Sequence, residues 1–281
     1  MKRVIIVIVF VLVFLIGLSV LLYPFVSDYV NSLSQSRVIT DYYDKVAELS
    51  EVDYSDLLNA AREYNERLLA NQHRFKMTDE ELKEYHTMLN FTGTGVIGTL
   101  EIDIIKVKLP IYLGTDEGVL QVGIGHLEGT SLPIGGPSTH SVISGHRGLP
   151  SSTLLTNADR LEVGDIFVLK ILNEVLTYQI DQIKIVLPEN VDYLGIFKDE
   201  DYCTLVTCTP YGINSHRLLL RGTRIFPESV DEPQQAQGRH ILRADAKRVN
   251  ALVGYVLCSV PVLLIVFIYN LVKSRKSKKR R

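Results

Sequence analysis

The sequence predicts an all-β domain that is preceded by helices and flanked by two membrane spans. Between residues 95 and 228, short β-branched and aliphatic runs alternate with turn residues and few helical segments, which indicates a sandwich or a closed barrel. An apolar run near each end of the 281-residue chain accounts for a high hydrophobic content of 46%. The formal net charge of -2 gives no reason to expect nucleic acid as a partner.

The first apolar run, Val4 to Leu22, is unbroken and long enough to cross a hydrocarbon core of about 30 Å. No small-x-small cleavage site follows it, so we expect an uncleaved anchor over residues 4–24 rather than a signal peptide. A second span is expected over residues 249–272, where Pro261 interrupts the apolar run in a way that membrane helices tolerate.

The basic residues outside these two runs predict the orientation of the chain. Residues 1–3 and the basic tail 273–281 are expected in the cytoplasm, which places everything between the spans outside the cell membrane. The tail is also suited to contact anionic membrane lipid. An exterior domain often carries disulfides, yet the chain has 3 cysteines.

Residues 25–94 are expected to form a helical extension. Apolar residues recur at helical intervals from Asp28 to Asn71, and we expect two helices with a break near 50–55. Thr78 and the three acidic residues after it resemble a helix N-terminus, within a stretch, 72–89, that we expect to be a mobile connector. The polar residues 229–248 are expected to be a flexible tether.

Eight strands are expected in the β domain. Asn173 and Glu174 predict a short hairpin turn, and Gly164 with Asp165 precedes another strand. The expected strands cover residues 96–103, 107–113, 141–144, 166–172, 175–180, 184–187, 204–208 and 218–220.

Cys208 ends one of these strands and is followed by a turn and a further strand. If the turn is centred near Gly212, Cys208 and Arg217 form a cross-strand pair with Cβ atoms about 5 Å apart. A thiol beside a permanent cation favours a reactive thiolate, although a buried structural cysteine would also fit this spacing. Cys203 lies an odd number of residues away, so the two side chains point to opposite faces and cannot form a disulfide.

A cysteine nucleophile needs a basic or charged partner, and four histidines lie in the β domain: His126, His140, His146 and His216. His146 ends an apolar strand between two glycines, where the backbone can approach a substrate closely. A zinc site made by His126, His140 and His146 is an alternative, but their spacings match no metal signature. We therefore expect no metal and no cofactor.

Three motifs together resemble the sortases, and among them the pilus-assembling class C branch. They are Thr204 to Asn214 followed by Arg217, Gly125 to Gly129, and Ser144 to Pro150. The resemblance runs from about residue 96 to 225. It implies a closed eight-stranded β-barrel with the active site at one mouth, with Cys208 as nucleophile and His146 and Arg217 as the catalytic histidine and arginine.

The resemblance also implies a reaction and its partners. The thiolate of a sortase attacks the threonine carbonyl of a Leu-Pro-x-Thr-Gly-like sorting signal, and the glycine end leaves. For class C the thioester is then resolved by a lysine amine of a pilin. The expected partners are therefore pilin or surface-protein substrates that carry a C-terminal sorting signal, together with membrane lipid.

Three other interpretations stay open at this point. A sortase that anchors proteins directly to the cell wall would carry the same residues. An L,D-transpeptidase would need a Ser-His-Gly-Cys run, which does not surround Cys208. A membrane-tethered β module that binds a surface partner would leave Cys208 buried and inert.

Class C members often carry an Asp-Pro-aromatic lid ahead of the barrel. Residues 71–90 contain no Asp-Pro pair, which leaves Phe75 or Met77 to anchor any lid. We therefore expect an autoinhibitory lid that is weaker or absent.

Overall fold

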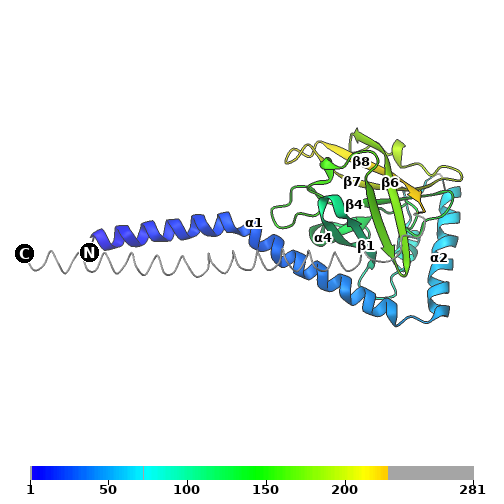
Figure 1. Cartoon of the computed structure of the whole chain (residues 1–281), viewed down its shortest axis with the longest axis horizontal. Helices are drawn as coiled ribbons and strands as arrows, with labels where there is room; N and C mark the ends of the chain where they lie inside the picture. The colour runs from blue at the N-terminus through cyan, green and yellow to red at the C-terminus, as the bar shows by residue number, and fades with distance from the viewer. Residues whose placement is uncertain (1, 72, 227–281) are drawn as a thin grey trace, which may run out of the picture. The chain divides into compact units, whose positions relative to one another are not determined.

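Eight strands close into a barrel in the order β1-β2-β3-β4-β7-β8-β6-β5 (Figure 1). The computed structural model describes residues 2–71 and 73–226. The pairs β2–β3 and β4–β7 are parallel, and the other neighbours are antiparallel. The strands are β1 (Val96–Ile102), β2 (Val107–Leu113), β3 (Ile124–His126), β4 (Thr139–Ser144), β5 (Ile166–Ile171), β6 (Glu174–Val186), β7 (Asp201–Thr209) and β8 (His216–Ile225).

The eight-stranded barrel is confirmed, but two of its strands differ from the expected ones. The segments 175–180 and 184–187 form the single strand β6, whose register shifts between Ile180 and Gln182. The shift interrupts the alternation of side chains, and this is why the sequence reads as two strands. β3 has only three residues, which is too few for a periodic pattern, and it is not among the expected strands.

The interior of the barrel holds the hydrophobic core. Side chains that point inward from different strands, such as Leu100, Ile111, Ile143, Phe167 and Leu205, are at most 1% exposed. Each buried side chain of this size contributes roughly 1.5–3 kcal/mol by its removal from water. The barrel is therefore a rigid frame for groups on its outer face.

One long helix, α1 (Lys2–Ala47), contains the first apolar run and continues to the barrel. Among the described residues it is the helix that is long and apolar enough to cross a membrane. Its most apolar 18-residue stretch has a mean hydropathy of 3.5, and none of that stretch is buried. Its second half packs on the barrel, where the Tyr42 hydroxyl donates to Ile97 O (2.8 Å) and accepts from Leu172 N (2.9 Å). The second expected span, the tether and the basic tail lie outside the described residues.

The helical extension continues through α2 (Glu51–Ala70) and α3 (Asp79–Tyr85). The break between α1 and α2 falls at residues 48–50, at the start of the expected range, because the Ser50 side chain caps α2 by accepting from Asp53 N (3.2 Å). Thr78 and Glu81 form a capping box at the start of α3, as the sequence indicates. The shorter helices are α4 (Glu117–Val122), η1 (Asp103–Ile105), η2 (Ala158–Arg160) and η3 (Asp192–Leu194).

The expectation of a mobile connector over 72–89 is wrong for its second half. Tyr85 is fully buried and Leu89 is 1% exposed. The Tyr85 hydroxyl lies 2.9 Å from His126 Nδ1 and accepts a hydrogen bond from Gly114 N (2.9 Å). These contacts fix α3 to β3 and to the end of β2.

Candidate active site

Cys208 lies on the outer face of the barrel near the end of β7. It pairs with Arg217 of β8 in the antiparallel register, as the spacing predicts. Cys203 points to the opposite face, where it is fully buried, and both thiols are free. Burial raises the pKa of the Cys203 thiol well above its usual range, so this second cysteine stays protonated and unreactive.

His146 follows β4, which runs parallel to β7 on the side opposite β8. In the parallel pairing of β4 with β7, Ser144 lies opposite Val206. The next residue still contacts β7, since Gly145 N donates to Val206 O (3.0 Å). The Thr207 hydroxyl also donates to Gly145 O (2.8 Å). These two hydrogen bonds keep the chain beside β7 just beyond Ser144, so His146 follows β4 on the side of β7 that lies away from β8.

The three expected site residues therefore come from β7, from β8 and from the segment that follows β4, the other neighbour of β7. This meeting requires the β4–β7 pairing, which joins segments about 60 residues apart in the sequence. Cys208 lies on the middle strand, between the imidazole side and the guanidinium side.

The His146 side chain lacks the partners that a structural histidine has. Its Nε2 atom is buried and has no hydrogen-bond partner in the part of the chain that the structure describes. The nearest carboxylate is Glu117 Oε2 of α4 at 4.0 Å, a distance that exceeds a hydrogen bond. An uncommitted ring nitrogen is free to exchange a proton with a substrate group.

Arg217 is held by the turn that joins β7 to β8. Its Nη1 atom donates to Asn214 O and to His216 O, both at 3.2 Å. Gly212 and Asn214 adopt positive φ angles of 75° and 59°, which suits a glycine and an asparagine in a tight turn. The turn thus sets the position of the guanidinium relative to Cys208.

Arg147 is a further residue of this site that sequence reasoning did not select. Its side chain is 7% exposed, and Nη2 lies 2.5 Å from Asp159 Oδ2. Nε donates to Thr156 O (3.1 Å) and Nη1 donates to the Thr209 hydroxyl (3.3 Å). Arg147 and Thr209 directly follow His146 and Cys208, so this arginine ties the two site segments together. The signal in the sequence that could have identified Arg147 is its position directly after His146.

The other two histidines of the proposed zinc site serve the fold. His126 Nε2 lies 2.8 Å from Ser131 O, so Nε2 carries the proton, and the Tyr85 hydroxyl lies 2.9 Å from both Nδ1 and the carbonyl oxygen of His126. Burial lowers the pKa of His126 to about 4, which keeps the ring neutral. No group of three potential metal ligands occurs among the described residues, so the structure does not bring the three histidines together around a metal.

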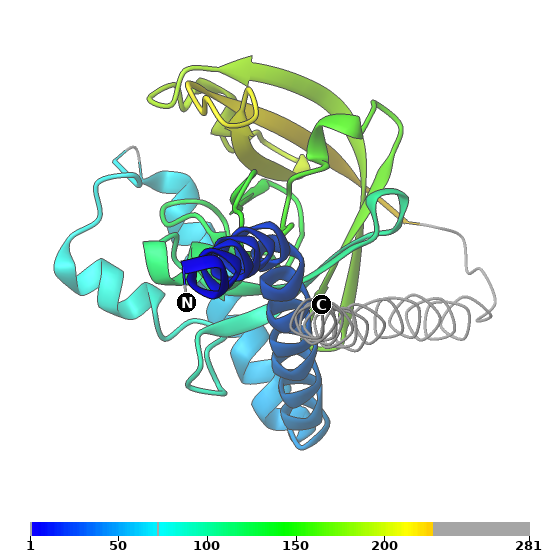
Figure 2. The same cartoon turned by 90° about the vertical axis from the view of Figure 1, so that its left-hand side faces the viewer.

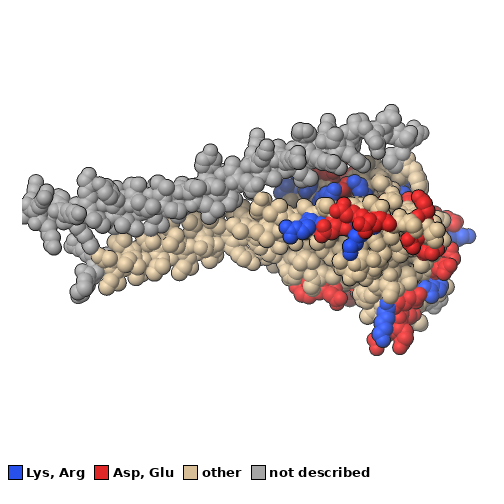
Figure 3. All heavy atoms as spheres, turned by 90° about the horizontal axis from the view of Figure 1, so that it is seen from below, with Lys and Arg blue, Asp and Glu red and all other residues tan. Residues whose placement is uncertain are grey.

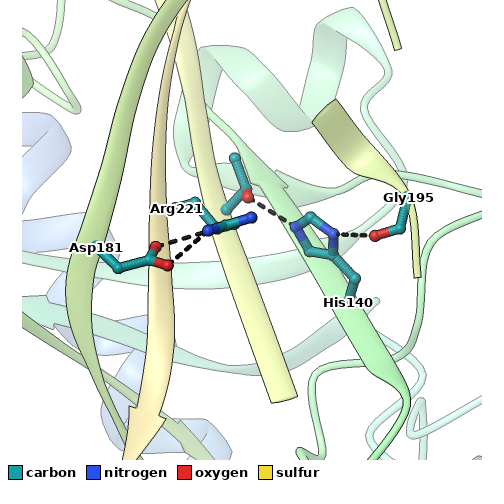
Figure 4. Close-up of polar contacts among 5 residues, drawn as sticks. His140, Asp181, Gly195 and Arg221 are labelled. Carbon is teal, nitrogen blue, oxygen red and sulfur yellow. Dashed lines mark hydrogen bonds and ion pairs between the residues drawn. The ribbon is translucent and has the colours of Figure 1, made fainter. Parts of the chain in front are cut away.

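His140 links β4 to the loop between β6 and β7, as Figure 4 shows. Its Nδ1 donates to Gly195 O and its Nε2 accepts from the Thr204 hydroxyl, each at 2.7 Å. Burial, opposed in part by the Gly195 contact, lowers the pKa of His140 to about 4. Beside His140, Arg221 forms a bidentate ion pair with Asp181, through Nε (3.0 Å) and Nη2 (2.6 Å). Figure 4 shows this ion pair and His140 on the same outer face of the barrel.

An apolar cluster covers the outer face of β4, β7 and β8 next to Cys208. Val142, Val186, Leu194 and Leu219 are each at most 8% exposed, and Leu127 and Val206 pack against them. Leu194 belongs to η3, in the loop that His140 anchors. This loop therefore forms one wall beside the strands that carry the site.

The segment that corresponds to a lid touches this wall. Arg74 Nη2 donates to Leu194 O (2.9 Å), and the Arg74 guanidinium stacks 4.7 Å from the Phe75 ring centroid. The chain also runs close to Gly129, where an added Cβ would lie 2.2 Å from Arg74 O. Phe75 is 39% exposed, so it fills no buried pocket.

A separate cavity of about 370 Å³ lies at the other end of β7 and β8. Its lining includes Asp201, Arg224 and Glu174. It contains no nucleophile, and Asp201 is seven residues away from Cys208 along β7, or about 23 Å at the usual rise. The chemistry is therefore assigned to the Cys208 end.

Comparison with known proteins agrees with the fold. The family model described as "Sortase domain" matches residues 100–225. Sortase C1 from Streptococcus agalactiae is 52% identical, with a TM-score of 0.67, and the match covers 68% of this chain and 100% of that one. Sortase C from Clostridium perfringens, solved with the C-terminal cell wall sorting motif, is 43% identical (TM-score 0.61; 68% and 99% covered).

A more distant relative is sortase D of Bacillus subtilis (strain 168), 31% identical over 131 residues. That match covers 46% of this chain and 63% of the relative, so the chain spans less than two thirds of it. The fold and the site define a cysteine transpeptidase of the sortase type. The chain belongs to the sortase family, and its structural neighbours are class C sortases. This membership does not agree with a non-enzymatic binding module.

Proposed function

We propose that this chain is a membrane-anchored transpeptidase that cleaves a Leu-Pro-x-Thr-Gly-like sorting signal between threonine and glycine. Cys208 is the nucleophile, and the thioester that it forms is resolved by a lysine amine of a pilin subunit. The observation that carries the proposal is the pairing of Cys208 on β7 with Arg217 on β8, together with the position of His146 two residues after β4, the strand on the other side of β7.

Each residue has a role that its surroundings support. The buried and unpartnered Nε2 of His146 protonates the leaving amine and later accepts a proton from the incoming one. Arg217 stabilises the oxyanion that develops on the threonine carbonyl, or holds the backbone of the substrate, from the strand next to Cys208. An acyl-enzyme separates the reaction into two steps, so two large substrates need not be bound at once.

The sorting signal is proposed to lie along the apolar cluster beside Cys208. The partly buried Leu127 and Val206 present apolar surface, Val142 and Leu219, at most 4% exposed, support it from within the cluster, and the η3 loop forms a wall. A solved relative, sortase C of Clostridium perfringens, is described with the C-terminal cell wall sorting motif, which supports this class of substrate.

The test is an acyl-enzyme experiment on the full chain in detergent micelles. We expect a Leu-Pro-x-Thr-Gly peptide to give a mass adduct equal to the peptide without its glycine end, which a lysine donor then consumes. Cys208→Ala should give no adduct while its thermal midpoint stays unchanged, because a thiol replaced by hydrogen on a strand surface is a small change. An adduct on Cys203 or none on the wild-type chain would contradict the assignment.

The same experiment separates the two kinds of sortase. With a pilin lysine peptide and a cell-wall amine present together, a pilus-assembling enzyme transfers the acyl group mainly to the lysine. Transfer mainly to the wall amine would favour the alternative, a sortase that anchors surface proteins to the cell wall. Class C neighbours support the first outcome.

The domain arrangement and orientation are part of the proposal. Residues 4–24 anchor the chain, residues 25–94 brace the barrel, and residues 95–228 form the catalytic domain outside the membrane. The tether 229–248, the second span 249–272 and the cytoplasmic tail 273–281 complete the two-span arrangement. The first anchor is supported by the apolar half of α1, whose most apolar 18-residue stretch has no buried residue.

A further inference from the structure

The helix that carries the membrane anchor also holds the loop that follows His146. Asp28 Oδ1 of α1 accepts from Thr153 N (2.6 Å), and Asn31 Nδ2 donates to Ser151 O (2.8 Å). One turn later, Gln35 Nε2 donates to Val122 O (2.9 Å) at the end of α4. These bonds attach the active-site end of the barrel to a defined part of α1.

That part of α1 lies close to the end of its apolar run. The helix is unbroken from Lys2 to Ala47, and the run ends at Leu22. Asp28 and Asn31 are therefore about 9 and 14 Å farther along the helix axis, at the usual rise per residue. Figure 3 shows uncharged residues along the apolar part of α1, while Lys, Arg, Asp and Glu gather on the rest of the molecule.

The turn between β7 and β8 lies at the same end of the barrel. Its Tyr211 ring contacts the loop after His146, since a Cβ added to Gly148 would lie 3.0 Å from that ring. Figure 1 shows this turn and the loop at the side of the barrel that faces the apolar half of α1, and Figure 2 views the molecule from that side.

The tip of this turn is apolar and uncharged. Tyr211 is 59% exposed and Ile213 is 71% exposed, and the residues 210–215 contain no charged side chain. Arg217 follows the turn, a cation that suits anionic headgroups. Tyrosine favours the boundary between headgroups and acyl chains because its ring is apolar and its hydroxyl polar. No partner within the described residues covers Ile213, whose exposed surface is apolar.

We propose that the active-site end of the barrel lies against the outer surface of the membrane, with Tyr211 and Ile213 in contact with lipid. The partner is the bilayer interface itself. The anchor helix keeps the turn close to the bilayer, so a small apolar contact is sufficient where free association would need a larger one. Cys208 then lies close to the membrane surface, where a substrate held in the same membrane reaches it.

The chain contains no tryptophan, so a single introduced tryptophan is a specific probe of this contact. Full-length Tyr211→Trp and Ile213→Trp variants are reconstituted in phosphatidylcholine and phosphatidylglycerol vesicles, with acyl chains either plain or brominated near the headgroup. Val175→Trp is the matched control, because Val175 is 55% exposed and lies in the β5–β6 hairpin at the other end of the barrel. Both leaflets contain brominated lipid, so quenching does not depend on the orientation in which the protein is inserted.

Both turn variants are expected to lose roughly half of their emission in brominated vesicles, as for a side chain that enters the interface by about 5–10 Å, and Val175→Trp to lose none. Equal loss at the turn and at the control, or no loss at the turn, overturns the proposal. Ile213→Trp decides the outcome if Tyr211→Trp disturbs the contact with Gly148. No acyl transfer is measured, so the result is independent of the proposed function.

Discussion

Two nearby histidines, one within β4 and one just after it, illustrate how one residue type serves opposite purposes. His140 lies within β4, and both of its ring nitrogens have hydrogen-bond partners at 2.7 Å. His146 lies two residues after β4, and its buried Nε2 has no partner among the described residues. His140 fixes the wall of the site, whereas His146 keeps a nitrogen uncommitted. The difference lies in the partners and not in the residue or its strand.

The largest expected effect is the loss of activity on replacing the uncommitted histidine. We expect His146→Gln to lower the rate of acyl-enzyme formation by about 10²–10⁴-fold, because it removes the general acid and base. Its thermal midpoint should stay the same, since no hydrogen bond to Nε2 is lost. The measurement is single-turnover mass spectrometry with the sorting-signal peptide.

The matched variant is His140→Gln, which tests the other half of the comparison. We expect a loss of about 1–3 kcal/mol in the free energy of unfolding and little change in the rate per folded molecule. If His140→Gln instead abolished acyl transfer in a fully folded protein, the separation of roles between the two histidines would fail.

A second prediction concerns Arg147, which ties the His146 and Cys208 segments together. Arg147→Met removes a buried guanidinium that pairs with the half-exposed Asp159 and donates to Thr156 O and the Thr209 hydroxyl, and we expect it to lower the free energy of unfolding by about 3 kcal/mol. Urea unfolding measures this change. Acyl-enzyme formation should fall in parallel, because the spacing of His146 and Cys208 loosens.

The control for Arg147 is its partner Asp159, whose side chain is 47% exposed. Asp159→Asn keeps the arginine and most of its hydrogen bonds, so we expect a loss of about 1 kcal/mol or less. An equal loss in both variants would show that the ion pair, rather than the link to Thr209, is what Arg147 contributes.

A third prediction follows from the lowered pKa values of His126 and His140, both about 4. Each ring is neutral when folded but takes up a proton near pH 6.5 when unfolded, so acid favours unfolding. Each histidine should therefore remove about 2 kcal/mol of stability between pH 7 and pH 5, and the loss ends near pH 4. Chemical unfolding at a series of pH values measures this slope, which His140→Gln should reduce; an unchanged slope would contradict the assignment.

The smallest expected effect concerns the segment in the place of a lid. Arg74 makes one hydrogen bond to Leu194 O, and Phe75 is 39% exposed. Such a contact is worth about 1 kcal/mol, so Arg74→Ala should change the alkylation rate of Cys208 by less than about fivefold. Peptide mapping identifies the labelled cysteine. A change of a hundredfold would reveal a strong lid despite the missing Asp-Pro pair.

The single substitution is a sharper test of the lid than deletion of the segment. A deletion that extends to Tyr85 would remove a fully buried ring and its hydrogen bonds to His126 and Gly114. Greater labelling of such a variant would report a damaged barrel. Arg74→Ala leaves α3 in place.

Several features of the molecule follow from local patterns in the sequence. The β-branched and aliphatic runs between turn residues predict β1, β2 and β5 to within one residue at either end. The Cys208–Arg217 pair is equally local, since the length of one turn sets the register of a hairpin. The motif around His146 identified the third site residue through its resemblance to a family.

Other features depended on contacts between distant segments. β3 is too short to have a period of its own, and it exists because β2 and β4 pair with it on either side. The segment that contains Tyr85 was expected to be a connector, but the buried hydrogen bonds of this residue fix α3 to the barrel. The hydrogen bond of Arg147 to Thr209 likewise requires that two distant segments meet. The sequence by itself predicted the all-β domain and the apolar N-terminal helix from local patterns, and it predicted the closed barrel and the candidate site residues through motifs that resemble a family. Only the tertiary structure decided which histidine is uncommitted and which end of the barrel meets the anchor, because both depend on side chains brought together from segments far apart in the chain.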